Sequence, residues 1–594
     1  MRSLRSPRCD PPEVACFDLF DTLIVRPFVR PTDLFRLIEE HEGRQGFAEA
    51  RISAEKEARR VLRREVSIDD IYSYLEDGFD DLLEVEIEAE TAMAIPDPDV
   101  VGILKDLSSE GSRVAVVSDM YLPRTVLEGI LSRCGIPCDR LFVSSEYGES
   151  KHSGGLFRIV SEETGVPFDR MSHIGDNPRS DRRVPRSLGI DATCRPSRID
   201  TYLRTHPDQR RFYERTCGLD RSVIVSMDML AEAGVIGSAP SSSWRNLGRR
   251  YGGPLAYAYS EHLSRTIRPD SVVLFASRDG YTPMRIISSL RGLEVPGTTM
   301  RYAHIQRIIS YVLSDDGIPY GPMDVPSRRR ERFRHDRAVS WMRYVIGFLK
   351  DDLGIDAVPS ADDDIVRMYG SRIDEIDSLR RTKAAEYRGY LSSMCGDGSV
   401  DIVDSTTMRF TSQRLLQEMI GRSAVGHYLV ALAGSGLPHT SFGRRRSPVA
   451  GWTRVNIPEF LLCSPEPPLR GWSGGPVFEE NPPAWEKERM DAYLEISDGE
   501  LEYALGIERV FGRMLPGMSY GSVAEWSMLS VSDPSIRPLL DRMRWASAPD
   551  HSDWMHLVPR TSDVPAMLKR VAADVVSRLN SGSDRFRGRY PAGS

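Results

Sequence analysis

The sequence predicts an α/β protein whose first part folds as a doubly wound parallel sheet. Four short apolar segments have the composition of strands that are buried on both faces. They are Val14–Phe17, Val114–Val117, Leu141–Val143 and Met171–Ile174. Segments with a helical pattern lie between them, as at Arg124–Cys134 and Gly155–Thr164. Strands that alternate with helices in this way are typical of a parallel sheet covered by helices.

Polar residues follow three of these strands. Asp18, Ser118 and Asp176 each stand at the end of an apolar run, and Lys151 lies in the polar segment GESKHSGG. The carboxyl ends of parallel strands share one edge of the sheet, so we expect these four side chains to converge. A nucleophilic carboxylate, a hydroxyl, an ammonium group and further carboxylates in one place favour phosphoryl transfer.

A charged insertion at Pro31–Glu90 interrupts the sheet pattern and is helical almost throughout. Its central helix is predicted at Phe47–Arg63. Ser67 and Asp70 have the spacing of a capping box that opens the next helix. We therefore expect a helical cap at about residues 28–96.

A second α/β region is predicted further along the chain. Its strand candidates are Ser271–Ala276, Val400–Val403 and Val425–Ala431. The predicted organisation is a first α/β domain at 12–200, a linker or helical connection at 201–250, a second α/β domain of unknown function at 251–483, a mostly helical region at 484–580 and a disordered tail at 581–594.

Composition and charge indicate which classes of partner and which compartment to expect. The chain of 594 residues has a net charge of −8, which gives no electrostatic reason to expect nucleic acid or a membrane surface as a partner. No apolar run approaches the roughly 20 residues of a membrane span, and the polar start lacks the apolar core of a secretion signal. Eight scattered cysteines without CxxC spacing indicate free thiols in a cytoplasmic protein. The oligomeric state stays open.

The motifs, in their fixed order, resemble the haloacid dehalogenase (HAD) superfamily. They are CFDLFDTL at Cys16–Leu23, VAVVSD at Val114–Asp119, Lys151, and HIGDNPRSD at His173–Asp181. The resemblance covers residues 12–200 and is to the branch that carries a helical cap on a Rossmann-like core. A two-domain bacterial subgroup, often found beside glycosyltransferases in gene sets for surface glycans or secondary metabolites, is similar in three further segments. These are SDMYLP at Ser118–Pro123, SRDGY at Ser277–Tyr281 and PEFLL at Pro458–Leu462.

The resemblance implies a magnesium-dependent phosphohydrolase or phosphotransferase acting on a small phosphorylated metabolite. Asp18 would be the nucleophile and would form an aspartyl-phosphate. Mg²⁺ would be held by Asp18, Asp176 and Asp181, and by the backbone carbonyl of Phe20.

Other residues would bind the substrate. By the same resemblance, Ser118 would hydrogen-bond the transferring phosphoryl group and Lys151 would neutralise its charge. Further substrate contacts are expected from Thr22, Asp119, Asn177 and, in the cap, Arg51. Arg51 and Arg59 share a helix face and would pair with a carboxylate or a second phosphate of the substrate. The alternative is an exposed face held by the Glu55–Arg59 pair.

One motif departs from the family's pattern. HAD phosphatases usually read DxDxT, in which the second Asp is the general acid and base, whereas this chain has Phe20 at that position. General acid–base help is worth about 10²–10⁴-fold in rate, so a phosphatase without it would be slow. Asp21 is a candidate replacement if the loop is distorted. Alternatively, Asp21 only stabilises the turn.

Three functions remain open on the sequence. The first is the magnesium-dependent phosphohydrolase or phosphotransferase, with a sugar or nucleotide derivative as substrate. The second is a catalytically weak domain that binds a phosphorylated ligand or has a regulatory role, which the presence of Phe20 favours. The third is a haloacid dehalogenase. Asp176 and Asp181 disfavour it, because a buried acidic cluster is costly without a cation.

A second ligand site is predicted in the later α/β region. Asp279 and Asp404 each follow an apparent strand, and Asp404, Ser405 and Thr406 precede a predicted helix at Ser412–Met419. Small hydroxyl residues before a helix are typical of a loop that binds phosphate. The alternative is a turn with a helix cap.

Overall fold

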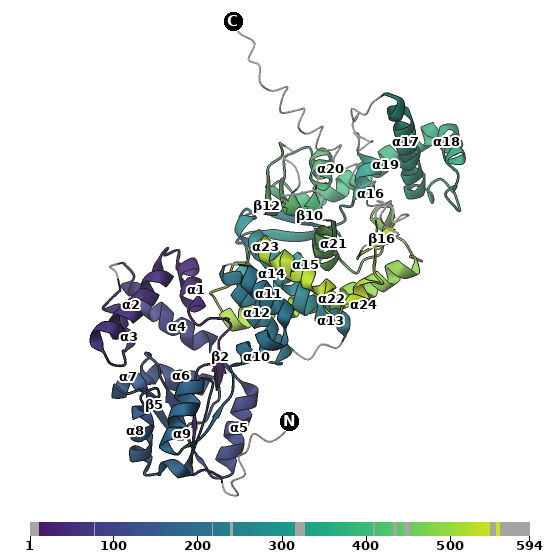
Figure 1. Cartoon of the computed structure of the whole chain (residues 1–594). Helices are drawn as coiled ribbons and strands as arrows, with labels where there is room; N and C mark the ends of the chain where they lie inside the picture. Colours follow the sequence, from purple (N-terminus) through teal and green to yellow (C-terminus); the bar gives the residue numbers. More distant parts are fainter. Residues whose placement is uncertain are drawn as a thin grey trace. The chain divides into compact units, whose positions relative to one another are not determined.

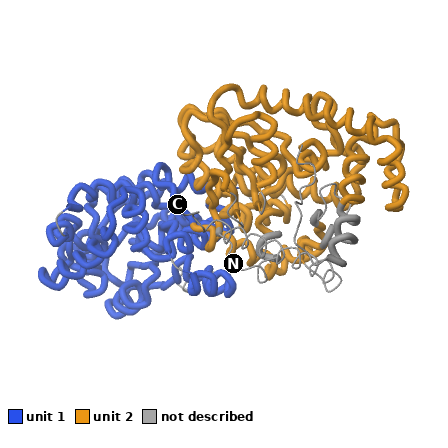
Figure 2. Tube along the Cα trace, turned by 90° about the horizontal axis from the view of Figure 1, so that it is seen from above, with its two compact units in different colours: residues 1–239, 506–518 blue, residues 240–505, 519–594 orange. Residues whose placement is uncertain are grey.

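A computed structural model describes most of the chain as two compact units (Figure 2). Unit 1 comprises residues 1–239 and 506–518, and unit 2 comprises residues 240–505 and 519–594. The described residues are 11–75, 78–216, 218–237, 242–314, 327–407, 410–431, 436–444, 452–546 and 554–558. The predicted disordered tail at 581–594 therefore lies outside the described residues.

The main sheet of unit 1 has five parallel strands in the order β5-β4-β1-β6-β7. The strands are β1 (Val14–Phe17), β4 (Arg113–Ser118), β5 (Arg140–Val143), β6 (Met171–Gly175) and β7 (Asp191–Cys194). All four side chains of β1 are fully buried, as expected for a central parallel strand covered on both faces. The strand order reverses between β1 and β6, which places a crevice at their carboxyl ends.

Short helices connect these strands (Figure 1). They are α5 (Pro98–Ser109), α6 (Arg124–Arg133), α7 (Ser144–Tyr147), α8 (Gly155–Thr164) and α9 (Val184–Leu188). Leu156, Phe157 and Val160 of α8 pack against Val14 and Cys16 of β1 in one apolar core. The predicted doubly wound α/β fold of this region is confirmed.

A layer of helices is inserted between β1 and β4 (Figure 1). It consists of α1 (Asp33–Glu42), α2 (Phe47–Leu62), α3 (Ile68–Tyr72), the 3₁₀ turn η1 (Asp80–Leu82) and α4 (Leu83–Met93). The chain enters and leaves this cap through β2 (Ile24–Val25) and β3 (Ile95–Pro96), which pair with each other. Asp70 N–H donates to Ser67 Oγ at 3.1 Å and Ser67 N–H donates to Asp70 Oδ2 at 2.9 Å, so the predicted capping box is present. After β7, the helices α10 (Arg198–Thr205), α11 (Pro207–Arg215) and α12 (Leu219–Glu232) follow.

Unit 2 contains a second five-stranded parallel sheet, in the order β12-β11-β10-β8-β9. The strands are β8 (Val272–Ala276), β9 (Thr299–Ala303), β10 (Val400–Thr407), β11 (Val425–Ala431) and β12 (His439–Arg444). Counted in chain order, the first sheet reads 3-2-1-4-5 and this one 2-1-3-4-5, so the two sheets differ in topology. Both sheets confirm the predicted α/β class.

Helices make up most of the rest of unit 2. They are α13 (Ser243–Leu247), α14 (Gly253–Thr266), α15 (Tyr281–Ser289), α16 (Arg307–Leu313), α17 (Ser327–Phe348), α18 (Asp362–Ser371), α19 (Ile373–Cys395), α20 (Thr411–Ile420), α21 (Trp452–Leu461), α23 (Tyr520–Met528), α24 (Arg537–Leu540) and α22 (Ala484–Phe511), of which residues 506–511 belong to unit 1. Two short ribbons pair β13 (Leu469–Trp472) with β14 (Pro476–Phe478) and β15 (Arg544–Ala546) with β16 (Trp554–His556). Leu274 and Ile402 of the sheet share an apolar core with residues of α16 to α20. The last three helices give the described C-terminal part its predicted helical character.

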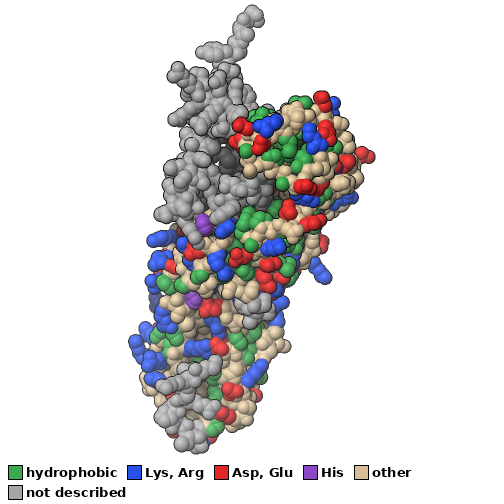
Figure 3. Space-filling view, turned by 90° about the vertical axis from the view of Figure 1, so that its right-hand side faces the viewer, with side chains coloured by type: hydrophobic (Ala, Val, Ile, Leu, Met, Phe, Trp, Pro, Cys, Tyr) green, Lys and Arg blue, Asp and Glu red, His purple; other side chains and the backbone are tan. Residues whose placement is uncertain are grey.

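In the described ranges, no helix combines the length and the apolar composition needed to cross a bilayer. Charged side chains of both signs are interspersed over the face shown in Figure 3.

Candidate functional site

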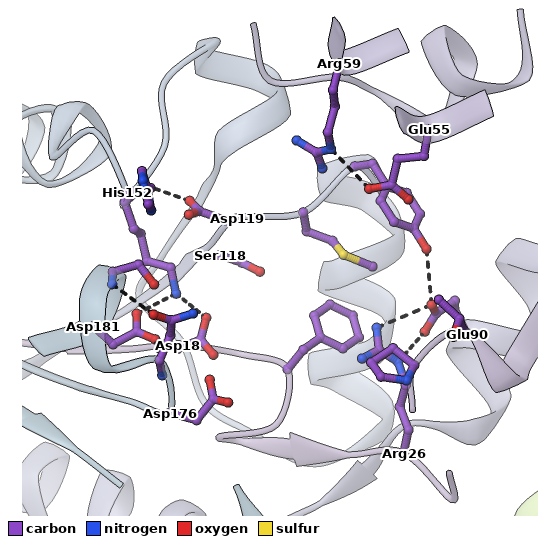
Figure 4. A pocket seen from close by; sticks show the side chains of 18 of the residues that line it. Asp18, Arg26, Glu55, Arg59, Glu90, Ser118, Asp119, His152, Asp176 and Asp181 are labelled. Atoms are coloured by element: carbon purple, nitrogen blue, oxygen red, sulfur yellow. Dashed lines mark hydrogen bonds and ion pairs between the residues drawn. The ribbon is translucent and has the colours of Figure 1, made fainter. Parts of the chain in front are cut away.

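Three carboxylates meet where the first sheet reverses its strand order (Figure 4). Asp18 directly follows β1, and its N–H donates to the carbonyl of Ile174 on β6 at 2.9 Å. Asp176 directly follows β6, and Asp181 lies in the following helical turn η3 (Pro178–Arg183). One oxygen of each carboxylate lies within 4.8 Å of the others. The structure thus brings together the acidic residues that the sequence placed at this edge.

A glycine allows Asp181 to reach the strand ends. A Cβ atom at Gly175 would lie 2.4 Å from Cγ of Asp181, which no side chain tolerates. The Asp181 carboxylate also lies 3.0 Å from Nε2 of His173 and accepts from Asn177 N–H at 2.9 Å. Burial lowers the pKa of His173, so its neutral ring donates from Nε2. His173 is a contributor to the site that the sequence did not single out.

Lys151 is the cation of the site. Its Nζ contacts Oδ1 of Asp18 and lies 2.8 Å from Oδ1 of Asp181. Its backbone N–H donates to Oδ1 of Asp119 at 2.8 Å. Burial alone would lower the pKa of Lys151, but Asp18, Asp181 and Asp119 outweigh it and raise the pKa. The ammonium group is therefore charged and fixed beside Asp18.

The three carboxylates differ in their affinity for protons. Burial, opposed by Lys151, raises the pKa of Asp18 to about 6. Burial, together with repulsion from Asp18, raises the pKa of Asp176 to about 8. Burial would also raise the pKa of Asp181, but Lys151 and His173 outweigh it and lower the pKa. One ammonium group does not neutralise this cluster. The hard oxygen donors of Asp18, Asp176 and Asp181 fit a divalent cation such as Mg²⁺.

The carboxylates form one wall of a cavity of about 480 Å³. Ser118, Asp119 and Asn177 also line it. Thr22 donates from Oγ1 to Oδ2 of Asp18 at 3.1 Å, so it orients the carboxylate. The side-chain oxygen of Asn177 is already engaged, because it accepts from two backbone N–H groups of η3 at 2.9 and 3.2 Å.

The opposite end of the cavity contains an ion pair that the sequence did not reveal, between Arg26 and Glu90, together with the pair of Glu55 and Arg59 (Figure 4). The guanidinium of Arg26 lies 4.0 Å from the ring centroid of Phe20. Its Nε and Nη2 donate to Glu90 of α4 at 3.0 and 3.3 Å. Arg59 and Glu55 of α2 also line the cavity and pair at 3.1 Å. The expected Glu55–Arg59 pair is thus present, on the cavity wall.

Asp21 differs from its predicted catalytic position. It adopts a left-handed backbone conformation with φ of 59°, and it is not among the residues that line the cavity of Asp18. The carboxylate lies 4.0 Å from Arg26 and lines a separate cavity of about 100 Å³ beside Asp97 and Arg198. The left-handed turn directs Phe20 and Asp21 to different cavities, so Asp21 does not replace the missing acid and base.

Arg51 also differs from its predicted substrate contact. Its side chain is fully buried, and its Nε and Nη2 donate to Glu86 of α4 at 2.8 and 2.7 Å. The rings of Phe35 and Tyr121 enclose the guanidinium at 4.7 and 4.8 Å. Arg51 therefore joins two cap helices and does not line the cavity.

The predicted second site lies in unit 2. The structure brings Asp279 and Asp404 together through Ser405, whose Oγ donates to Asp279 and whose N–H donates to Asp404 at 2.8 Å. The predicted phosphate loop is wrong, because residues 404–407 continue strand β10 and pair with β11 up to Thr407. Thr406 belongs to this strand extension.

Fold and site together define an α/β protein with a capped crevice and a triad of carboxylates, two of them buried and one half-buried. No protein-family model matches the chain, and no curated protein matches it. Solved structures of similar fold include an L-2-haloacid dehalogenase from Xanthobacter autotrophicus with chloropropionic acid covalently bound, at 15% identity over 30% of this chain and 75% of that one, with a TM-score of 0.24. CbbY from Rhodobacter sphaeroides in complex with phosphate is 17% identical over 30% of this chain and 84% of that one, with a TM-score of 0.22. A HAD family enzyme from Bacteroides thetaiotaomicron, in complex with magnesium and inorganic phosphate, is 15% identical over 31% of this chain and 94% of that one, with a TM-score of 0.24. These similarities concern the fold alone.

Proposed function

We propose that unit 1 is a magnesium-dependent phosphohydrolase or phosphotransferase of the HAD type, acting on a small phosphorylated sugar or nucleotide derivative. The observation that carries this proposal is the carboxylate triad at the sheet edge, with oxygens within 4.8 Å of one another and Lys151 against Asp18. A nucleophile, a cation and a set of hard metal ligands occupy one crevice. That combination suits phosphoryl transfer.

The chain's own residues account for most of the transfer step. An oxygen of Asp18 attacks phosphorus, the bond from phosphorus to the leaving oxygen breaks, and an aspartyl-phosphate forms. Thr22 fixes the attacking carboxylate, and Lys151 neutralises charge that develops on the phosphoryl oxygens. Ser118, buried at the end of β4, donates a hydrogen bond to the same group. Mg²⁺, held by Asp18, Asp176 and Asp181, would supply charge neutralisation for both the carboxylates and the phosphate.

The absence of an acid at position 20 makes the reaction depend on the leaving group. Phe20 lies under the Arg26 guanidinium, and Asp21 points into another cavity. No side chain at these two positions can give a proton to the leaving oxygen or activate water. We therefore propose slow turnover and a substrate whose leaving group needs little protonation.

The same observation favours a second candidate function, a phosphate-binding module without turnover. Its cavity would hold a phosphorylated ligand without transferring the phosphoryl group. For either function, the sequence resemblance to the two-domain bacterial subgroup supports a role in glycan or secondary-metabolite biosynthesis.

A phosphatase screen with and without Mg²⁺ tests the proposal. We expect phosphate release that requires Mg²⁺, is lost in Asp18→Asn and is retained in Asp106→Asn, an exposed carboxylate on α5. Tight binding of a phosphate ester without turnover would support the binding module. Halide release from a 2-haloacid without metal would contradict both functions.

A further inference from the structure

The sheet of unit 2 has its own strand reversal, between β8 and β10. β9 lies on one side of β8 and β10 lies on the other. In open parallel sheets, ligands bind outside the carboxyl ends of the strands at this point. β10 pairs with β8 only up to Val403, but with β11 up to Thr407. From Asp404 onward, β10 therefore has a strand neighbour on the β11 side only, and the general rule for strand reversals places a ligand crevice on its other side.

Two carboxylates stand at this crevice. Asp279 follows β8 in a tight turn that needs a glycine, since a Cβ at Gly280 would lie 2.8 Å from Cβ of Phe275. Ser405 holds both carboxylates, with Oγ donating to Asp279 and N–H donating to Asp404 at 2.8 Å. Burial raises the pKa of both groups, and repulsion from Asp279 contributes to the rise of Asp404 to about 6. The pair is held together in spite of its like charge.

Arg278, the residue before Asp279, belongs to a group of buried charged side chains. Arg278 donates from Nε to Sγ of Cys463 at 3.3 Å and lies 3.9 Å from Glu486 of α22. Arg489, on the same helix, contacts Glu486 and donates to the carbonyl of Ser464 at 2.8 Å. Glu486 and Arg489 are 0% and 1% exposed. Buried charges are costly, so such a group is weak evidence for stabilisation, and next to a strand reversal it marks a candidate functional site.

Two polar groups in this region have no hydrogen-bond partner among the described residues. Arg307, at the start of α16, is exposed and has neither a hydrogen-bond nor an ion-pair partner in the part of the chain that the structure describes. The preceding residue, Gln306, donates from Nε2 to Ser277 Oγ at 3.3 Å, which places the start of α16 at the end of β8, and the charge of Arg307 lowers the pKa of both Asp279 and Asp404. The Oγ1 atom of Thr406 is buried and has no hydrogen-bond partner among the described residues.

We propose that this crevice is a second ligand site, which binds a phosphorylated polyol such as a sugar phosphate or the ribose phosphate of a nucleotide. Asp279 and Asp404 accept hydrogen bonds from neighbouring hydroxyls, and Arg307 pairs with the phosphoryl group. A phosphate ion alone would be repelled by the two carboxylates, and a metal ion alone would be repelled by Arg278 and Arg307. A ligand that carries both hydroxyls and a phosphate satisfies both sets of charges.

Hydrogen exchange on the full-length Asp18→Asn protein tests this site. The probes are ribose 5-phosphate, glucose 6-phosphate and uridine monophosphate, each in excess, and inorganic phosphate is the control. We expect at least one ester to slow exchange in peptides covering 277–281 and 403–407. Arg307→Gln, an exposed change that does not threaten folding, and Asp404→Asn should each weaken this effect at least about tenfold. The exposed Asp397→Asn, at the opposite end of β10, should not.

Three results would overturn the proposal. The first is that none of the esters protects these peptides. The second is that protection survives both Arg307→Gln and Asp404→Asn. The third is that inorganic phosphate protects the peptides as well as the esters do. Protection at peptides covering 18–22 and 176–181 is recorded in the same experiment. It reports on unit 1 alone, so failure of the proposed function there is distinguishable from failure of this site.

Discussion

Asp176→Asn is expected to stabilise the metal-free protein at alkaline pH and to destabilise the Mg²⁺-loaded protein. Burial and repulsion from Asp18 raise the pKa of Asp176 from 3.8 to about 8. A carboxyl whose pKa is higher in the folded state stabilises that state below its unfolded pKa, and this contribution is lost as the pH rises toward 8. Asn does not titrate, so the variant should lack this loss of stability between pH 4 and 8.

The size of the effect follows from the same pKa. The full rise corresponds to about 6 kcal/mol. Asp176 is partly exposed, so screening by water reduces this value and we expect about 3 kcal/mol. With Mg²⁺ bound, the variant should be less stable than the wild type, because it has lost one of three carboxylate ligands.

Hydrogen exchange of β1 and β4 amides, measured in chelator between pH 5 and 8, gives the opening free energy of unit 1. All eight tryptophans lie in unit 2, so their fluorescence during urea unfolding serves as an internal control. The exposed Asp106→Asn is the matched variant and should follow the wild type. Equal pH dependence of the wild type and Asp176→Asn in chelator, or equal stabilisation by Mg²⁺, would refute the reasoning.

Three further predictions concern single residues of unit 1. Gly175→Ala forces Asp181 away and should lower Mg²⁺ affinity about 10- to 100-fold by calorimetry, and unchanged affinity would contradict the placement of Asp181. Phe20→Asp supplies an acid and should raise kcat about 10²-fold relative to Phe20→Leu, and equal rates for these two variants would show that protonation is not limiting. Arg51→Met leaves Glu86 buried without its cation and should cost about 3–5 kcal/mol of stability at unchanged KM. A raised KM with unchanged stability would restore Arg51 as a substrate contact.

Local patterns in the sequence were sufficient to predict much of the first α/β domain and its cap. The boundaries of α8 match the predicted Gly155–Thr164, and the capping box of Ser67 and Asp70 is present. Both depend on neighbours within a few residues. The convergence of Asp18 and Asp176 was also predictable, because parallel strands leave no choice about which ends share an edge.

Contacts between residues far apart in the chain were not predictable. Arg51 has the spacing of a surface residue on α2, but its partner Glu86 lies on α4 and takes it into the cap interior. Asp404 precedes small hydroxyl residues as a phosphate loop would, but pairing with β11 extends β10 through them. The direction of Asp21 depends on one left-handed residue, which no pattern in the loop signals.

The most direct test of the central claim is a crystal structure of the protein soaked in Mn²⁺, a substitute for Mg²⁺ that can be located by its anomalous scattering. We predict one strong peak in the unit 1 crevice, bonded to oxygens of Asp18, Asp176 and Asp181 at about 2.0–2.2 Å. A crevice without a peak, or a peak held by other residues, would contradict the assignment of this site to metal-assisted phosphoryl transfer.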